Sequence, residues 1–113
     1  MRQIAVLAGI VFFTSAIGAS VAYAAGNAES GKSKAAQVCA ACHGPDGNKP
    51  SAPDQPVLAG QYPDYLVKAL SDYKSGKRQN PIMKGFASTL SKKDMEDLAA
   101  WFSSQKSALH DQR

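Results

Sequence analysis

The two cysteines of this 113-residue chain are separated by only two residues, Cys39-Ala40-Ala41-Cys42, and a histidine, His43, follows directly. In small secreted domains an even number of cysteines usually builds a disulfide framework. A bridge across two intervening residues would close a very short loop and tie no distant segments together. The cysteine pair therefore has a local purpose, and disulfides cannot hold this fold together.

Residues 1–24 are predicted to be a secretory signal peptide. Arg2 precedes an apolar run over residues 4–17, and the segment ends in an Ala-Tyr-Ala sequence that suits cleavage after Ala24. The alternative is a membrane anchor retained over residues 3–25, although several small and hydroxyl-bearing residues thin its apolar run. Both interpretations place the rest of the chain outside the cytoplasm, and we expect it in the bacterial periplasm.

Residues 25–113 are predicted to form one domain, because the chain is too short for two independent cores. Loss of the signal peptide lowers the net charge from +4 to +3, since Arg2 is the only charged residue removed. No low-complexity tract, internal repeat or block of like charge indicates disorder or a repeat array. We expect no nucleic-acid partner, and no stable membrane insertion after cleavage.

The C-x-x-C-H pattern of residues 39–43 is typical of covalent haem attachment. The Cys39 and Cys42 thiols can add across the two haem vinyl groups, and the adjacent His43 imidazole can then bind the iron from the same side of the ring. The sequence thus predicts one haem c with its iron.

Three other interpretations of the motif lack support in the sequence. A thioredoxin-like redox pair needs a preceding strand, and a zinc site needs four ligands. The chain has no second cysteine pair, and its other histidine, His110, lies in a segment expected to be an exposed tail. A chance pair on a core helix is the third interpretation, and together with the export signal the motif favours haem over all three.

Apolar periodicity predicts an all-α fold with three main helices. The first is expected from Asn27, an N-cap, to about residues 44–45, and the second from Pro63 to Gly76. The third follows Ser91, which forms a capping box with Asp94. Its expected buried residues are Met95, Leu98, Ala99, Trp101 and Phe102.

The expected connections over residues 44–61 and 77–90 are long for so small a domain. Three short helices with two such loops bury too little apolar surface to fold alone. A large apolar ligand that forms part of the core would supply the missing surface, so the loops agree with the haem prediction.

Met83 is the predicted second axial ligand of the iron. It lies in the expected loop after Asn80-Pro81, whereas Met95 is explained as a helix residue that packs on Leu90. The alternative is that Met83 merely fills the core. Methionine opposite histidine favours the ferrous state and leaves no position for oxygen or a substrate.

Residues 25–113 resemble the class I c-type cytochromes, in particular small bacterial monohaem proteins such as cytochrome c-553 and one half of the dihaem cytochrome c4. The resemblance rests on Gly31, the C-x-x-C-H motif, residues 56–61 (PVLAGQ), Met83 and residues 97–102 (DLAAWF). It implies the cytochrome c fold, three main helices and long loops around one haem.

The resemblance also implies roles for particular residues. The carbonyl of Pro56 would accept the second imidazole proton of His43, and Leu58 would line the haem. The first and last helices would cross at Gly31, which would face Leu98 and Trp101. One departure is Ala35, where the family often has an aromatic residue.

The predicted function is that of a soluble, non-enzymatic carrier of single electrons between respiratory-chain components. Two alternatives remain: a haem-bearing subunit of a larger oxidase or dehydrogenase complex, and a haem enzyme or gas sensor with an open sixth position. The expected partners are redox proteins that dock transiently on a partly basic surface. The candidate steering residues are Lys32, Lys49, Lys77, Arg78, Lys84, Lys92 and Lys93.

Overall fold

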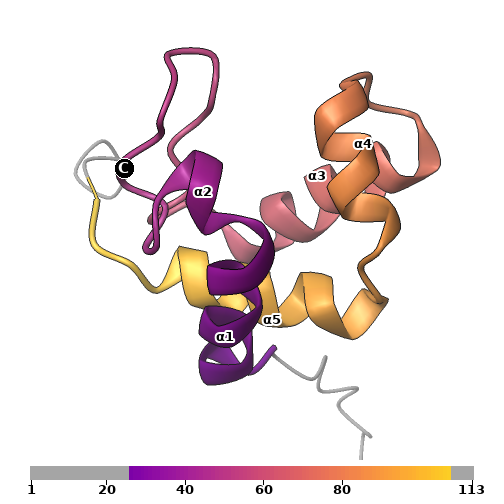
Figure 1. Ribbon diagram of the computed structural model, residues 1–113. Coiled ribbons are helices and arrows are strands. Elements are labelled where there is room, and N and C mark those ends of the chain that lie inside the picture. Colours follow the sequence, from indigo (N-terminus) through magenta and orange to yellow (C-terminus); the bar gives the residue numbers. More distant parts are fainter. Residues whose placement is uncertain (1–25, 108–113) are drawn as a thin grey trace, which may run out of the picture.

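The computed structural model describes residues 26–107, which contain helices and no strand, as the all-α prediction requires (Figure 1). The predicted signal peptide and His110 lie outside these residues. Within the described part of the chain, no helix is long and apolar enough to cross a membrane. The helices are α1 (Ala28–Val38), α2 (Ala40–His43), α3 (Pro63–Ser75), α4 (Pro81–Ser88) and α5 (Lys92–Ser103).

The predicted first helix is two helices, which corrects the expectation of one continuous element up to residues 44–45. It begins as expected, because the Asn27 side chain caps it by accepting from Ser30 N at 2.8 Å. At Cys39 the backbone leaves ideal helical geometry, with φ −118° and ψ −34°, and α2 follows as a separate turn. Gly44, with φ 83°, ends α2.

Helix α3 has the predicted ends. Pro63 occupies the first turn, where its missing N–H costs no hydrogen bond, and Gly76 ends the helix in the left-handed conformation with φ 84°. Lys74 lies in the last turn, as expected, and its Nζ donates to Leu90 O at 2.5 Å. This bond joins α3 to the segment just before α5.

Helix α4 lies in the segment predicted to be a loop, so the expectation for residues 77–90 was wrong. Asn80 is the N-cap, and its Oδ1 accepts from Ile82 N at 3.1 Å and from Met83 N at 3.0 Å. Pro81 takes the first helical position, where its fixed φ suits a helix. The Asn-Pro pair followed by apolar residues at helical spacing was the available signal.

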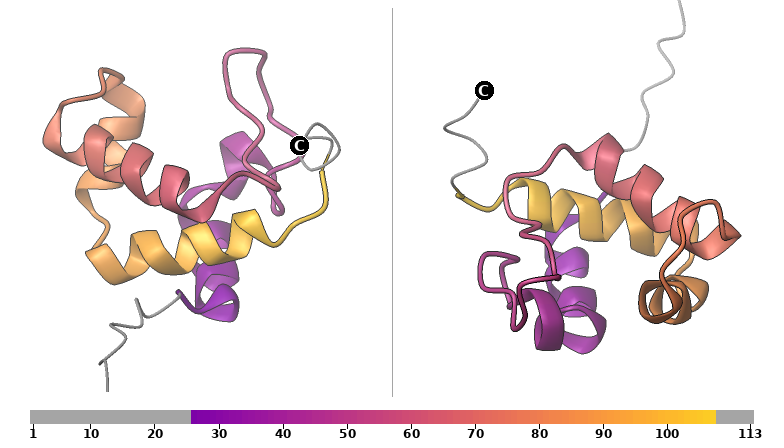
Figure 2. Two further views of the ribbon diagram at one scale, coloured as in Figure 1. Left: turned by 180° about the vertical axis from the view of Figure 1, so that it is seen from behind. Right: turned by 90° about the horizontal axis from the view of Figure 1, so that it is seen from above.

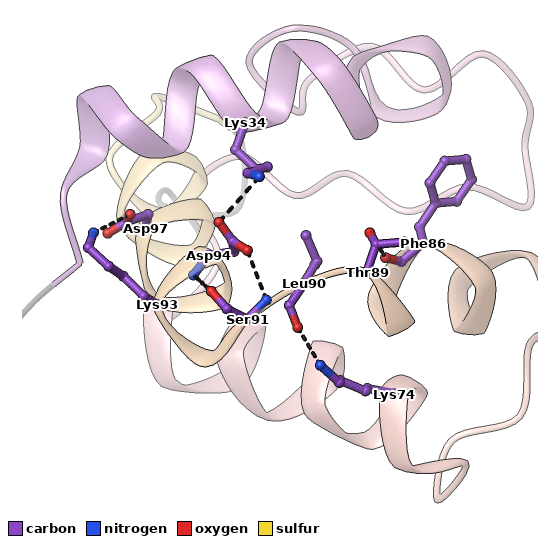
Figure 3. Close-up of polar contacts among 9 residues, drawn as sticks. All are labelled: Lys34, Lys74, Phe86, Thr89, Leu90, Ser91, Lys93, Asp94 and Asp97. Atoms are coloured by element: carbon purple, nitrogen blue, oxygen red, sulfur yellow. Dashed lines mark hydrogen bonds and ion pairs between the residues drawn. The ribbon is translucent and has the colours of Figure 1, made fainter.

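Helix α5 begins with the predicted capping box (Figure 3). Asp94 N donates to Ser91 Oγ at 3.0 Å, and Ser91 N donates to Asp94 Oδ2 at 2.8 Å. Leu90 and Met95 are both buried, which agrees with the predicted hydrophobic staple. The other expected core residues of α5 are buried too, except Trp101, which is half-buried.

Helices α1 and α5 pack across each other (Figures 1 and 2). Gly31 lies at the crossing. A Cβ atom on Gly31 would lie 1.9 Å from Asp97 O and 2.9 Å from Trp101 Cβ. The crossing expected at Gly31 and Trp101 is therefore present, with the Asp97 carbonyl as the nearest group rather than Leu98. Ala35, one turn further along α1, is fully buried.

Polar contacts at this crossing fix the register of the two helices. Asn27 N donates to Asp97 Oδ1 at 2.7 Å, and Lys93 Nζ lies 2.6 Å from Asp97 Oδ2. These partners hold the pKa of the Asp97 carboxyl below its usual range, chiefly through the hydrogen bond from Lys93. Lys34 of α1 forms an ion pair with Asp94 of α5 at 3.3 Å (Figure 3).

Candidate haem-binding site

A cavity of about 390 Å³ opens between α2 and α4, with α3 and α5 contributing to its wall. Figures 1 and 2 show α2 and α4 apart from each other on the same side of α5, with α4 next to α3. The wall is mainly apolar and draws on segments far apart in the sequence. Its residues include Val38, Leu58, Leu66, Leu70, Leu98 and Phe102.

Cys39, Cys42 and His43 line this cavity together. The imidazole of His43 is buried, and its Nδ1 lies 2.9 Å from the carbonyl oxygen of Pro56, the contact that the family resemblance implied. A carbonyl can only accept a hydrogen bond, so Nδ1 donates to it and Nε2 is the ring nitrogen that remains for a metal ion. An unprotonated imidazole nitrogen, oriented through the opposite ring nitrogen, is what a metal ion binds.

The two thiols do not have the properties of a redox-active pair. They are free, and burial together with the neighbouring Cys42 raises the pKa of Cys39 to about 11. Reactive C-x-x-C pairs instead have a cysteine whose pKa is lowered, so that the thiolate forms near neutral pH. Residues 26–107 also contain no group of three His, Cys, Asp or Glu side chains placed to hold a metal ion. Neither the thioredoxin-like nor the zinc interpretation gains support.

Met83 and Leu58 reach the same cavity from other parts of the chain. Met83 lies in the first turn of α4, where the Asn80 cap holds its backbone N–H, and its side chain is half-buried. Leu58 is half-buried and lies in the long segment that leads from α2 to α3. Both residues line the cavity, as does Pro56.

Large apolar side chains at the cavity are more exposed than such residues usually are. Ile82 is 68% exposed, Tyr65 47%, Phe86 42% and Val57 37%, and all four line the cavity. A contiguous exposed apolar surface around a cavity indicates that a bound apolar group covers it. Val57 belongs to the PVLAGQ segment of the family resemblance, whereas the other three residues were not predicted. Ile82 and Phe86, four residues apart on one helix face, carried the available signal.

The donor set and the wall therefore fit a haem. Cys39 and Cys42 could supply the thioether sulfurs and the imidazole of His43 a nitrogen, and the apolar wall could accommodate a large flat ring. A helical fold with this site defines a c-type haem protein.

The chain belongs to the cytochrome c family, since the family model described as Cytochrome c matches residues 28–106. It carries one covalently bound haem c, and Cys39 and Cys42 fit the attachment motif of that family.

Individual relatives agree with this assignment. The chain is 54% identical over 86 residues to cytochrome c4 of Pseudomonas aeruginosa, which covers 76% of this chain and 42% of that relative. It is 43% identical over 72 residues to a thiosulfate dehydrogenase electron acceptor of Stutzerimonas stutzeri, covering 64% of this chain and 33% of that relative. The crystal structure of reduced recombinant cytochrome c4 from Pseudomonas stutzeri matches with a TM-score of 0.66 and 49% identity, covering 73% of this chain and 47% of that one. The chain thus spans less than half the length of these relatives.

Proposed function

We propose that this chain is a carrier of single electrons, with His43 and Met83 as the axial ligands of its haem iron. The observation that carries this proposal is that the two side chains, from α2 and α4, line one cavity together with both cysteines. When bound, the haem supplies an iron that changes oxidation state by one electron.

The protein's own part is to hold the ligands still. The Pro56 carbonyl fixes the His43 ring at 2.9 Å, and the Asn80 cap fixes the first turn of α4 on which Met83 lies. Two ligands held by the protein leave no open position for a substrate, which supports a carrier rather than an enzyme. Cys39 and Cys42 anchor the ring, and Leu58 packs beside it.

The carbon monoxide reaction of the reduced protein tests this proposal. A visible spectrum of the haem-loaded protein should show a low-spin haem in both oxidation states, unchanged when carbon monoxide is added to the reduced form. Met83→Ala should bind carbon monoxide readily, because it vacates one axial position. Met95→Leu is the matched control, since Met95 is buried in α5 and a swap of similar volume should leave the spectrum unchanged.

The opposite result would favour the haem enzyme or gas sensor. In that case the wild-type protein would bind carbon monoxide as readily as Met83→Ala, and the spectrum of the variant would match that of the wild type. A colourless, folded secreted protein with free thiols would remove the haem assignment itself.

We infer that the partners are other redox proteins, met in the periplasm. The relative named as an electron acceptor of thiosulfate dehydrogenase supports a partner of this class. Among the candidate steering residues, Lys92 and Lys93 form ion pairs within α5, whereas Lys49, Lys77 and Lys84 make none with any residue from 26 to 107. Association with a partner should slow as ionic strength rises, and a flat response would contradict steering by these lysines.

A second candidate function is that of a haem-bearing part of a larger redox assembly. The specific observation in its favour is a relative, 36% identical over 64 residues, that is named as the cytochrome subunit of sulfide dehydrogenase of Chlorobaculum tepidum. Stoichiometric copurification of the cytochrome with an oxidase or dehydrogenase would support it, and recovery of the free monomer would support the carrier.

We also propose that residues 1–24 are removed and that residues 25–113 are the mature domain. The charged start, the apolar run and the Ala-Tyr-Ala sequence support cleavage after Ala24. The mass of the protein from the periplasmic fraction tests the proposal. A mass that includes the leader, with the protein in the membrane fraction, would indicate the retained anchor.

A further inference from the structure

Arg78 lies in the short connection between α3 and α4, and its side chain forms part of the cavity wall. Its backbone N–H donates to Asp72 O at 3.0 Å, which ties this connection to the last turn of α3. Arg78 was expected among the surface cations that steer a redox partner. The structure instead puts it at the edge of the haem-binding cavity, while its neighbour Lys77 does not line the cavity.

Two tyrosines of α3 hold the Arg78 guanidinium in place. Nη1 donates to the hydroxyl of Tyr65 at 3.2 Å, and Cζ lies 4.9 Å from the centre of the Tyr73 ring. Both tyrosines line the cavity as well. The hydrogen bond and the contact with the aromatic ring restrain the Arg78 side chain before any ligand binds. The side chain therefore loses less rotamer freedom when a ligand binds.

Arg78 forms no ion pair with any acidic side chain of residues 26–107, and the charge of Asp72 raises its pKa less than the hydrogen bond to Tyr65 does. The acid closest to it in the chain, Asp72, already forms an ion pair with Lys68. Among the described residues that line the cavity, Asp54 is the only acidic one. It makes no ion pair with Arg78. A guanidinium has five N–H donors in a planar fork that matches a carboxylate, and only one of these donates to Tyr65.

The ligand that fills this cavity brings carboxylates with it. A haem is an apolar ring that bears two propionate groups, and the wall described above accounts only for the ring. We propose that Arg78, positioned by Tyr65 and Tyr73, binds a propionate of the haem through charge-assisted hydrogen bonds. This inference rests on haem attachment at Cys39 and Cys42, and it is independent of which partners the protein serves.

Resonance Raman spectroscopy of the haem-loaded protein tests this inference directly, because low-frequency propionate bending bands respond to hydrogen bonding at the propionate. In Arg78→Gln the propionate band should shift. Arg78→Lys, which keeps the charge but loses the planar fork, should shift the same band by less. The matched control is Lys77→Gln, which removes the same charge one residue away from the cavity wall and should leave the band in place.

The midpoint potential gives a second readout. Loss of a positive charge beside the haem stabilises the ferric form, so the potential of Arg78→Gln should fall by more than that of Lys77→Gln, whose exposed charge is screened. Tyr65→Phe keeps the ring but loses the hydroxyl, and it should shift the Raman band in the direction of Arg78→Gln by a smaller amount. It also provides the test if Arg78→Gln does not fold.

The Raman band decides the outcome. An unshifted propionate band in Arg78→Gln overturns the proposal, whatever the potential does. If that variant also associates more slowly with a redox partner, Arg78 is a docking residue instead. A purely structural role would lower the melting temperature and leave the band unmoved. In all of these cases an unchanged haem spectrum would leave the proposed electron-carrier function standing.

Discussion

Replacement of Gly31 by alanine should force α1 and α5 apart. A Cβ at this position would lie 1.9 Å from the carbonyl oxygen of Asp97, where ordinary contacts are 3.4–4 Å. The oxygen belongs to the backbone of a helix and cannot rotate away, so the crossing must open by about 1.5 Å to restore van der Waals contact. The movement would also strain the 2.7 Å hydrogen bond from Asn27 N to Asp97.

The expected magnitude follows from two opposing terms. Overpacking of a close contact costs about 1–3 kcal/mol, with the upper end expected where backbone meets backbone. Alanine regains about 1 kcal/mol of helix propensity. We therefore expect Gly31→Ala to lower the free energy of unfolding by about 2 kcal/mol, and the melting temperature by about 10 °C for a domain of this size.

Gly85→Ala is the matched control for this experiment. Gly85 also lies inside a helix, α4, but a Cβ there would meet nothing within 4 Å. Only the higher helix propensity of alanine then matters, so the free energy of unfolding of this variant should rise by up to about 1 kcal/mol. Thermal and guanidinium unfolding of the haem-loaded proteins, followed by circular dichroism, would measure both changes. A Gly31→Ala protein as stable as the wild type would refute the argument that this glycine is required by the helix crossing.

Three further changes test other parts of the fold. Asn80→Ala removes the cap of α4 and should cost about 1 kcal/mol, measured by guanidinium unfolding; Asn80→Ser, which retains a capping group, should cost less. Leu98→Ala, at a side chain only 1% exposed, should lower the free energy of unfolding by about 2–5 kcal/mol, and a loss below 1 kcal/mol would mean that the site is not close-packed. The lowered pKa of Asp97 stabilises the fold above the usual carboxyl range, and this contribution disappears as the pH falls through the folded-state pKa. Asp97→Asn should thus be less stable at neutral pH and lose less stability below about pH 4, and parallel acid-unfolding curves would contradict this.

Helix ends were predictable where short-range chemistry specifies them. The side chains of Asn27 and Ser91 satisfy backbone N–H groups within three residues, and Pro63 and Gly76 have the conformations that a helix start and a helix end require. Each of these interactions is complete within one turn of chain. Local sequence is therefore sufficient to predict them.

Helix α4 and the break at Cys39 were missed because they depend on surroundings. An eight-residue helix is too short to be stable alone, and α4 is held by packing against α3. At Cys39 the residues on either side form helix readily, and the periodicity shows no interruption. The separate turn of α2 became visible only in the backbone geometry, where it places both cysteines and His43 on one cavity.

The chemistry of this protein can be read from local sequence, because the spacing of Cys39, Cys42 and His43 specifies covalent haem attachment within five consecutive residues. Tertiary structure alone decided what surrounds that chemistry. Pro56, Met83 and Leu98 come from three separate segments and meet one cavity only when the helices pack. The spacing of the C-x-x-C-H residues is fixed by the covalent chain that joins them. The residues of the cavity wall are far apart in the chain, and chain entropy keeps them apart until the fold brings them together.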